Sequence, residues 1–429
     1  MPVTLTYPGV YIEEVSSGVR TITGVATSIT AFIGRAKRGP VDEATTINSF
    51  GDYERIFGGL DLNSTMSYAV RDFYLNGGSQ AVIVRLFRAT DDNNNGKAKI
   101  TFGGLSFEAA SPGSWGNDLA VSIDLDISEE LATQLGVELF NLTVTYGKPG
   151  QPPVATEKYL NITVQGDSER RIDKVLAAQS SLIKWCEGEA LPSNIETIRS
   201  AQEDIQIAEE KVAGAENIAG RDAAETKLEQ ARTALEALIT RQEGDDGKAL
   251  TTNEYTTGLN LRKDKKGLFA LENVDLFNLL CIPPDTETNN VDATLIDTAA
   301  AYCEKRRAML IVDPHSDWTN KTKVLKHDEP NRLDQYIITR SKNAALFFPR
   351  LKQSNPLNDN RMEEFVPCGA VAGIMARTDT ERGVWKSPAG LDATLRGVPE
   401  LFVKLTDAEN GELNPLGVNC LRSFPNPHP

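Results

Sequence analysis

The side chains best suited to catalysis in this 429-residue chain are few, and one short segment holds most of them. The chain has three histidines, His315, His327 and His428. The first belongs to the segment DPHSD, residues 313–317, which directly follows the apolar run AMLIV. Because open α/β sheets place ligand groups at the carboxyl ends of strands, this segment could supply a Ser/His/Asp set or a pair of metal ligands.

Other features of the sequence do not favour catalysis. The members of a catalytic triad converge from different elements rather than from neighbouring positions, and the GxSxG elbow does not occur in the sequence. The CxxC and HExxH spacings of zinc sites are also missing. We therefore predict no catalytic residue, no metal site and no cofactor, and we interpret Asp313 as a capping residue in a turn that includes His315.

A second candidate is the loop GRAKRG, residues 34–39, which also follows an apolar run. Its three cations, Arg35, Lys37 and Arg38, lie between two glycines and could bind an anion. The loop matches neither the GxxxxGK[ST] nor the GxGxxG pattern of phosphate-binding loops. We therefore favour a basic surface turn, or one half of a charge-complementary protein contact, over a nucleotide site.

The N-terminal segment has the clearest interaction pattern. Apolar residues alternate on both sides of a Pro-Gly break, at Val3, Leu5, Tyr7, Val10 and Ile12. The polar stretch 13–28 follows and could span up to ~50 Å at about 3.3 Å per residue. Such a tethered strand could pair with the sheet edge of a neighbouring molecule or return to its own sheet, and the residues themselves leave both possibilities open.

Composition and charge exclude several classes of protein. The chain is 40% hydrophobic and carries 45 basic and 60 acidic residues, a net charge of -15. These values are typical of a globular protein and disfavour a nucleic-acid binder. No apolar run is long enough to span a membrane, and the first residues do not resemble a signal peptide. The five cysteines, which lie far apart, indicate buried thiols. We expect a chain made and assembled in the cytoplasm.

Two separated stretches of the sequence predict an α/β core. The apolar run 29–33, a helix that begins after Ser64 and ends at Gly77-Gly78, and the strand QAVIVRLF form a right-handed βαβ unit. The same order returns in a strand ending at Pro283-Pro284, a helix over 291–306 and the strand AMLIVDP, followed by the apolar run NAALFFP. Strands that are apolar on both faces are typical of a largely parallel sheet covered by helices. We predict a discontinuous core, residues 20–90 and 250–425.

An inserted domain is predicted over residues 91–190, where the hydrophobic period changes to two. Alternation of this kind indicates antiparallel strands with one face exposed to solvent. We expect these strands over about 97–166, followed by a helix from about Ile172 to Trp185. The residues expected to share the buried face are Leu119, Val121, Ile123, Leu125, Ile127, Phe140, Leu142, Val144, Tyr146, Leu160, Ile162 and Val164.

Residues 191–249 are rich in alanine and glutamate and have the seven-residue spacing of packed helices. Two registers that are out of phase meet beside Gly214 and Gly220, so we predict a helical hairpin rather than one helix of ~70 Å. Between residues 193 and 247 there are 13 acidic and 6 basic side chains, which favours a solvated helical surface over an acidic docking site. The two registers are Ile198, Ala201, Ile205, Ala208, Val212, Ala215 and Ala219, and then Ala224, Leu228, Ala231, Leu235 and Leu238.

Five motifs together resemble the sheath protein of contractile phage tails and related contractile injection systems. They are YPGVYIEEV, SITAFIGRAKRGP, SPGSWGNDL, GAVAGIMARTDTERGVWKSPAG and LNPLGVNCLRSFP. The resemblance covers residues 1 to about 190 and 265 to 425, and the helical insertion has no counterpart in it. Residues 1–19 correspond to an extended N-terminal arm, and 426–429 form a short tail.

The resemblance implies a structural, non-enzymatic subunit of a phage tail or an injection particle. Protomers would stack as hexameric rings around an inner tube and drive its injection by contracting. Baseplate and terminator proteins and other sheath paralogues would be further partners, and neither nucleic acid nor membrane is implied. Residues 1–15 match the family's arm, so Val3, Leu5, Tyr7, Val10 and Ile12 inherit a role in strand exchange between subunits. Family members usually continue beyond the RSFP motif, which implies a truncated form or a terminal sheath paralogue.

Two other classes of protein remain as alternatives. One is an α/β hydrolase or nucleotide-binding enzyme with a regulatory helical hairpin, which would use Asp313, His315 and the loop 35–38. The other is a monomeric adaptor that binds partners through the hairpin. An enzyme would lose activity in the His315→Ala variant, whereas a sheath subunit would lose no function.

Overall fold

The computed structural model describes residues 27–91, 95–127, 129–215, 217–286, 288–326 and 329–424. The arm residues Val3, Leu5, Tyr7, Val10 and Ile12 lie outside this part of the chain, as do His327 and His428. The prediction that the N-terminal strand exchanges between subunits therefore stays a prediction.

A seven-stranded sheet forms the core, in the order β17-β13-β12-β11-β1-β3-β2. Neighbouring strands are parallel except β2, which runs antiparallel to β3. The sheet combines strands from both ends of the chain, since β1 lies between β3 and β11. The predicted α/β core with a largely parallel sheet is therefore confirmed. Its strands are β1 (Thr30–Gly34), β2 (Ala44–Ile47), β3 (Ala81–Arg85), β11 (Leu279–Cys281), β12 (Met309–Val312), β13 (Ala344–Phe348) and β17 (Val418–Cys420).

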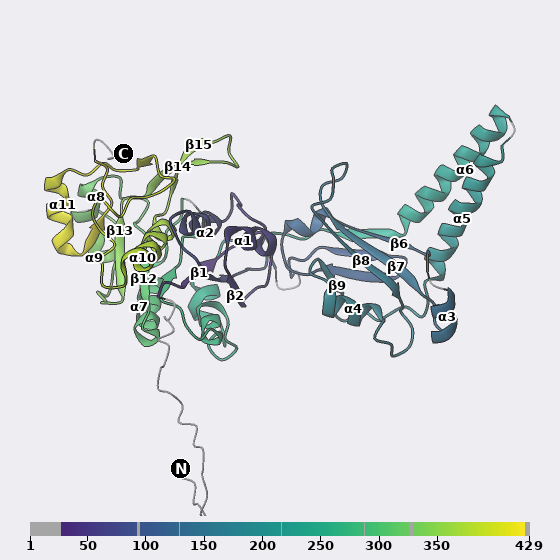
Figure 1. Ribbon diagram of the computed structural model, residues 1–429, viewed down its shortest axis with the longest axis horizontal. Helices are drawn as coiled ribbons and strands as arrows, with labels where there is room; N and C mark the ends of the chain where they lie inside the picture. Colours follow the sequence, from purple (N-terminus) through teal and green to yellow (C-terminus); the bar gives the residue numbers. More distant parts are fainter. Residues whose placement is uncertain are drawn as a thin grey trace, which may run out of the picture.

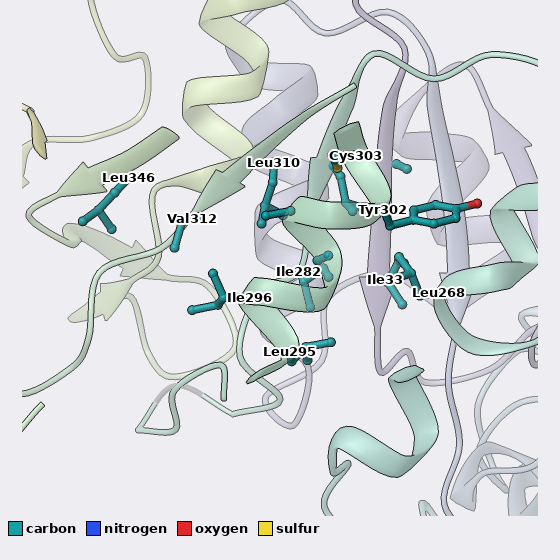
Figure 2. Packing of buried hydrophobic residues seen from close by; sticks show 14 of the residues in the cluster. Ile33, Leu268, Ile282, Leu295, Ile296, Tyr302, Cys303, Leu310, Val312 and Leu346 are labelled. Carbon is teal, nitrogen blue, oxygen red and sulfur yellow. The ribbon is translucent and has the colours of Figure 1, made fainter. Parts of the chain in front are cut away.

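Helices cover both faces of this sheet, because its strands are apolar on both sides. Alternate residues of β1 face opposite ways: Ile33 packs on the side of α7, and Phe32 on the side of α1, α2 and α10. Figure 2 shows the α7 side, where Ile33 and Leu310 from the strands lie near Leu295 and Tyr302 from the helix. The core helices are α1 (Phe50–Phe57), α2 (Thr65–Leu75), α7 (Ala293–Arg306), α8 (Lys321–Leu325), α9 (Leu333–Tyr336), α10 (Cys368–Arg382) and α11 (Asp407–Leu413).

A small antiparallel sheet projects from the core beside α2 (Figure 1). In its order, β15-β14-β16, the strand β15 pairs with β14 alone among the described strands. The turn between β14 and β15 uses Asp359 and Asn360, both with positive φ angles. These strands are β14 (Leu351–Asn355), β15 (Arg361–Phe365) and β16 (Glu400–Leu401).

A second β-rich body lies at the other end of the molecule and carries a protruding pair of helices (Figure 1). Two antiparallel sheets, β10-β4-β5-β9 and β6-β7-β8, share one hydrophobic core. Its elements are β4 (Lys99–Phe102), β5 (Leu105–Ala109), β6 (Leu119–Asp124), α3 (Glu129–Leu135), β7 (Phe140–Tyr146), β8 (Ala155–Ile162), α4 (Ile172–Gln179), β9 (Ile183–Trp185), α5 (Glu196–Ala213), α6 (Ile218–Ala237) and β10 (Ile239–Gln242).

The structure corrects two predictions for this body. Leu160 is 61% exposed, and Tyr159 takes the inward position, because Asn161 has a φ of 53° and interrupts the alternation of β8 beside a register shift. The helix predicted to end at Trp185 ends at Gln179, and residues 183–185 form β9. Glu157 explains this break, because its carboxylate accepts hydrogen bonds from the Ser180 and Ser181 hydroxyls at 2.6 and 2.7 Å.

The protruding helices α5 and α6 follow the two hydrophobic registers closely. Every register position on α5 and from Ala224 onward is buried or half-buried, and most intervening residues are exposed. Ala219 is an exception, because α5 ends at Ala213 and Ala219 lies exposed in the first turn of α6. The chain then returns through β10, which pairs with β4. The division of the chain into domains at residues 90, 190 and 249 stays a prediction.

Candidate interaction surfaces

The segment 313–317 lies at the carboxyl end of β12, as the sequence indicates, but its side chains do not form a catalytic set. His315 Nδ1 accepts a hydrogen bond from the Asp317 backbone N–H at 3.1 Å. The Ser316 hydroxyl instead accepts from Asn290 Nδ2 at 2.8 Å. Burial lowers the pKa of His315, so the ring is neutral at pH 7. Ser316 and His315 thus bond to other groups, and no direct hydrogen bond can pass a proton between them. The segment is a folded turn and not a catalytic set.

Asp313 is the most perturbed carboxyl group of this segment. It is buried, and its Oδ1 accepts from the Cys368 backbone N–H at 2.8 Å, while Oδ2 has no hydrogen-bond partner among the described residues. Burial in this apolar site raises the pKa of Asp313 to about 7. Among the described residues no group of three or more His, Cys, Asp and Glu side chains is placed to hold a metal ion. Asp313 therefore ties β12 to the start of α10.

The Asp313→Asn variant is expected to be more stable than the parent at pH 8 and to have a flatter stability profile between pH 4 and pH 7. The folded pKa lies above the unfolded value, so the native state binds more protons and its stability falls as pH rises through this window. Between pH 5 and pH 8 the parent should lose on the order of 2 kcal/mol of unfolding free energy. Urea unfolding at pH 5 and pH 8 measures it, with Asp317→Asn as the exposed control. An unchanged slope in Asp313→Asn would contradict the assignment.

Two of the three cations of loop 34–39, Arg35 and Arg38, are bound within the chain. Arg35 Nε lies 3.0 Å from Asp285 Oδ1, in a pair that is almost fully buried. Arg38 stacks its guanidinium over the ring of Tyr146, with 5.1 Å to the centroid, and Gly39 N–H donates to the Ser111 hydroxyl. This loop is therefore a charge-complementary contact inside the molecule. It joins the core to the β-rich body.

Arg85, at the end of β3, is the central clamp of this junction. Its guanidinium is buried and donates to the carbonyls of Ala36, Gly39 and Pro112 at 2.9, 2.8 and 2.8 Å. Burial lowers the pKa of Arg85 to about 10, and the side chain stays charged at pH 7. Pro112 belongs to the SPGSWG motif, so this motif serves to connect the two bodies.

Arg85→Met is expected to destabilise the fold by about 2–4 kcal/mol, because three buried carbonyls lose their donors. The free energy of unfolding in urea measures this loss. Arg55→Met is the matched control: Arg55 is 72% exposed, it pairs with Asp52 at 2.8 Å, and its loss should cost less than about 0.5 kcal/mol. Equal effects of the two variants would argue against the clamp.

Open strand edges and exposed apolar side chains are the candidate interaction surfaces of the described chain. The edge strands are β17 and β2 in the large sheet, β15 and β16 in the small one, and β10, β9, β6 and β8 in the β-rich body. Exposed apolar side chains gather in the loop after α10, where Trp385 is 85% exposed. We did not predict Trp385 as a site. Its sequence context could have indicated the exposure, because this tryptophan stands among Gly, Lys, Ser and Pro residues, where burial is not expected.

None of the helices in the described part of the chain combines the length and the hydropathy needed to span a bilayer. Four of the five cysteines are buried as expected, and Cys420 is half-buried.

Residues 248–428 match the family described as the phage tail sheath protein central domain. The sheath tail protein of Listeria innocua has a similar structure, with a TM-score of 0.50 and 12% identity over 93% of this chain and 66% of that one. The sheath tail protein of Desulfitobacterium hafniense gives a TM-score of 0.49 and 13% identity, covering 97% and 72%. The contracted helical sheath of the anti-feeding prophage gives 0.43 and 17%, covering 99% and 66%. A search of curated proteins finds no match.

The family match over residues 248–428 confirms the resemblance to tail sheath proteins. Tail sheath proteins are structural, which agrees with the prediction that the chain is not an enzyme. The chain spans 66% of the length of the Listeria innocua protein.

Proposed function

We propose that this chain, whose residues 248–428 match the phage tail sheath family, is a structural subunit of a contractile tail sheath. The family match carries the proposal, and it coincides with strands β11, β12, β13 and β17 of the large sheet. Asp313, His315 and Arg35 each bond to other groups of the same chain, which supports a structural role over the enzyme alternative.

In this proposal the subunits stack as hexameric rings around an inner tube. The arm residues Val3, Leu5, Tyr7, Val10 and Ile12 link each subunit to a neighbour by adding a strand to its sheet. Each buried Val, Leu or Ile in a donated strand contributes about 1.5–3 kcal/mol. Because the link recurs at every subunit, modest individual contacts give a stable mesh.

Strand β15 is the acceptor that we favour for the arm. Its edge away from β14 pairs with no described strand and lies on a hairpin that projects from the core (Figure 1), and Met362 on this strand is 48% exposed. Edge strands with exposed apolar side chains invite pairing with another chain. The nearby Leu357, 47% exposed, extends the apolar surface available to an incoming strand.

Contraction is then a rigid-body rearrangement between two packings of the same folded subunit. Its free energy is stored when the extended state assembles, so the mechanism requires no nucleotide. The β-rich body and the helices α5 and α6 extend away from the core (Figure 1). In this proposal they do not obstruct contacts between the cores of neighbouring subunits.

Sedimentation velocity across a concentration series tests the proposal. A sheath subunit should associate into large particles as its concentration rises, and addition of a tube protein should lower the threshold. A chain that sediments as a monomer at every concentration, with and without a tube protein, would refute the role.

A further inference from the structure

The loop that follows α10 exposes an apolar patch to solvent. Val384, Trp385 and Leu391 are 60%, 85% and 64% exposed. By contrast, Trp115 and Trp318 are each 2% exposed. The patch is held in shape by Gly383, whose φ of 92° turns the chain and leaves room for the Trp385 ring against its α-carbon. Exposed apolar side chains that lie this close together in sequence, on one loop, are candidates for an interaction site.

Charged side chains surround this patch, which we name the Trp385 patch and define as Val384, Trp385 and Leu391. Three cations lie beside it in sequence, Arg382, Lys386 and Arg396, together with three acids, Asp379, Glu381 and Asp392. Arg382 makes a long contact of 3.9 Å with Asp392, and both side chains are mostly exposed. Lys386 and Arg382 also border a shallow hollow of about 180 Å³ between the last turn of α10 and the loop. The surroundings thus carry no net charge, on a chain whose overall net charge is -15.

The described chain begins beside this patch. The Ser28 hydroxyl donates to Asp379 Oδ2 at 2.7 Å, on the last turn of α10. Ser28 therefore lies beside the last turn of α10, which ends at Arg382, and 26 residues precede the described part. They include the apolar alternation Val3, Leu5 and Tyr7, followed by Glu13-Glu14.

We propose that, in the unassembled subunit, residues 3–14 of the same chain dock on the Trp385 patch. The alternating apolar side chains cover Val384 and Trp385, and Glu13-Glu14 lie against Arg382 and Lys386. Residues 15–26 connect residues 3–14 to the described chain. Fully extended they would span up to ~40 Å, which is long enough for residues 3–14 to reach the Trp385 patch. Because the segment is tethered beside the patch, its effective concentration is in the millimolar range, which favours docking within the chain over capture by a second copy.

Docking within the chain would regulate assembly, a consequence that rests on the proposed sheath function. A strand held on its own subunit is unavailable to a neighbour. Exchange then requires that the sheet edge of a neighbour compete for the strand, so free subunits remain apart until a growing end presents that edge. The docking itself does not depend on the sheath role and is tested separately.

Acrylamide quenching of tryptophan fluorescence tests the docking on the full chain at concentrations where it is monomeric. Trp385 should be quenched several-fold less efficiently in the full chain than in a variant lacking residues 1–15. The Trp385→Phe variant removes the reporter, so truncation should not change quenching in that background. Equal quenching of Trp385 with and without residues 1–15 would overturn the proposal.

Point variants test whether the apolar face of residues 3–14, and not the segment in general, protects Trp385. Leu5→Asp should raise quenching of Trp385 to the level of the truncated chain, whereas Thr6→Asp, on the opposite face of the alternation, should leave it low. Protection that disappears on dilution of the monomer would assign the contact to a second copy and would overturn docking within the chain. Loss of polymer formation with protection intact would instead count against the sheath function.

Discussion

Removal of residues 1–15 is expected to abolish assembly of the chain into ordered polymers and to leave its core folded. The arm supplies five alternating apolar side chains, Val3, Leu5, Tyr7, Val10 and Ile12, and the described core clusters are built from residues from Ile29 onward. Loss of several contacts worth about 1.5–3 kcal/mol each, at every subunit, removes the links on which a polymer depends. Sedimentation and electron microscopy measure the polymer, and circular dichroism measures the fold.

The matched control for this deletion is the double variant Thr4→Asp, Thr6→Asp, which keeps the apolar face and changes the opposite one. It should still polymerise, with a threshold concentration near that of the parent. Polymers of normal form from the chain that lacks residues 1–15 would refute strand exchange.

The second large effect is expected at Gly369, in the first turn of α10. A Cβ at this position would overlap the backbone carbonyl of Ala69 on α2, and one at Gly373 would lie 2.5 Å from the Phe73 carbonyl oxygen. The two glycines therefore let α10 and α2 pack backbone to backbone. Gly369→Val should destabilise the core by about 3 kcal/mol or more, because backbone atoms cannot move aside as a flexible side chain can.

Urea unfolding and soluble yield measure this loss. Gly411→Ala is the control, since Gly411 lies in helix α11 and a Cβ there meets no atom within 4 Å. That variant should be neutral or more stable by up to about 1 kcal/mol. If Gly369→Val were as stable as Gly411→Ala, the close packing of α10 on α2 would be wrong.

The close approach also explains one of the motifs that carry the family resemblance. In GAVAGIMAR, Gly369 and Gly373 recur at a spacing of four and face α2, while Val371 and Ala372 are buried in the core. The sequence shows the small residues and their spacing. It does not show which helix they meet, because that depends on the order of strands in the sheet.

The hydrophobic pattern of the sequence predicted the central strands of the core because their side chains are buried on both faces of the sheet. All five residues of β1 and all five of β3 are buried, so their apolar runs could only be central strands. The helices α5 and α6 were equally readable, since the seven-residue registers mark the buried seam from Ile198 to Leu238.

Tertiary contacts decided the features that could not be read from local pattern. The break after Gln179 depends on Glu157, which lies more than twenty residues away and binds Ser180 and Ser181. The inward turn of Tyr159 depends on the left-handed conformation of Asn161. Loop 34–39 looked like a basic surface from its sequence, and the acid that pairs with Arg35 is Asp285, 250 positions later.

Negative-stain electron microscopy of the purified chain across a concentration series, alone and with a tube protein, tests the proposed sheath role. We expect hollow tubes built of stacked rings, each with six subunits. Particles that remain monomeric under every condition, in a chain whose intact mass and fold are verified on the same sample, would contradict that role.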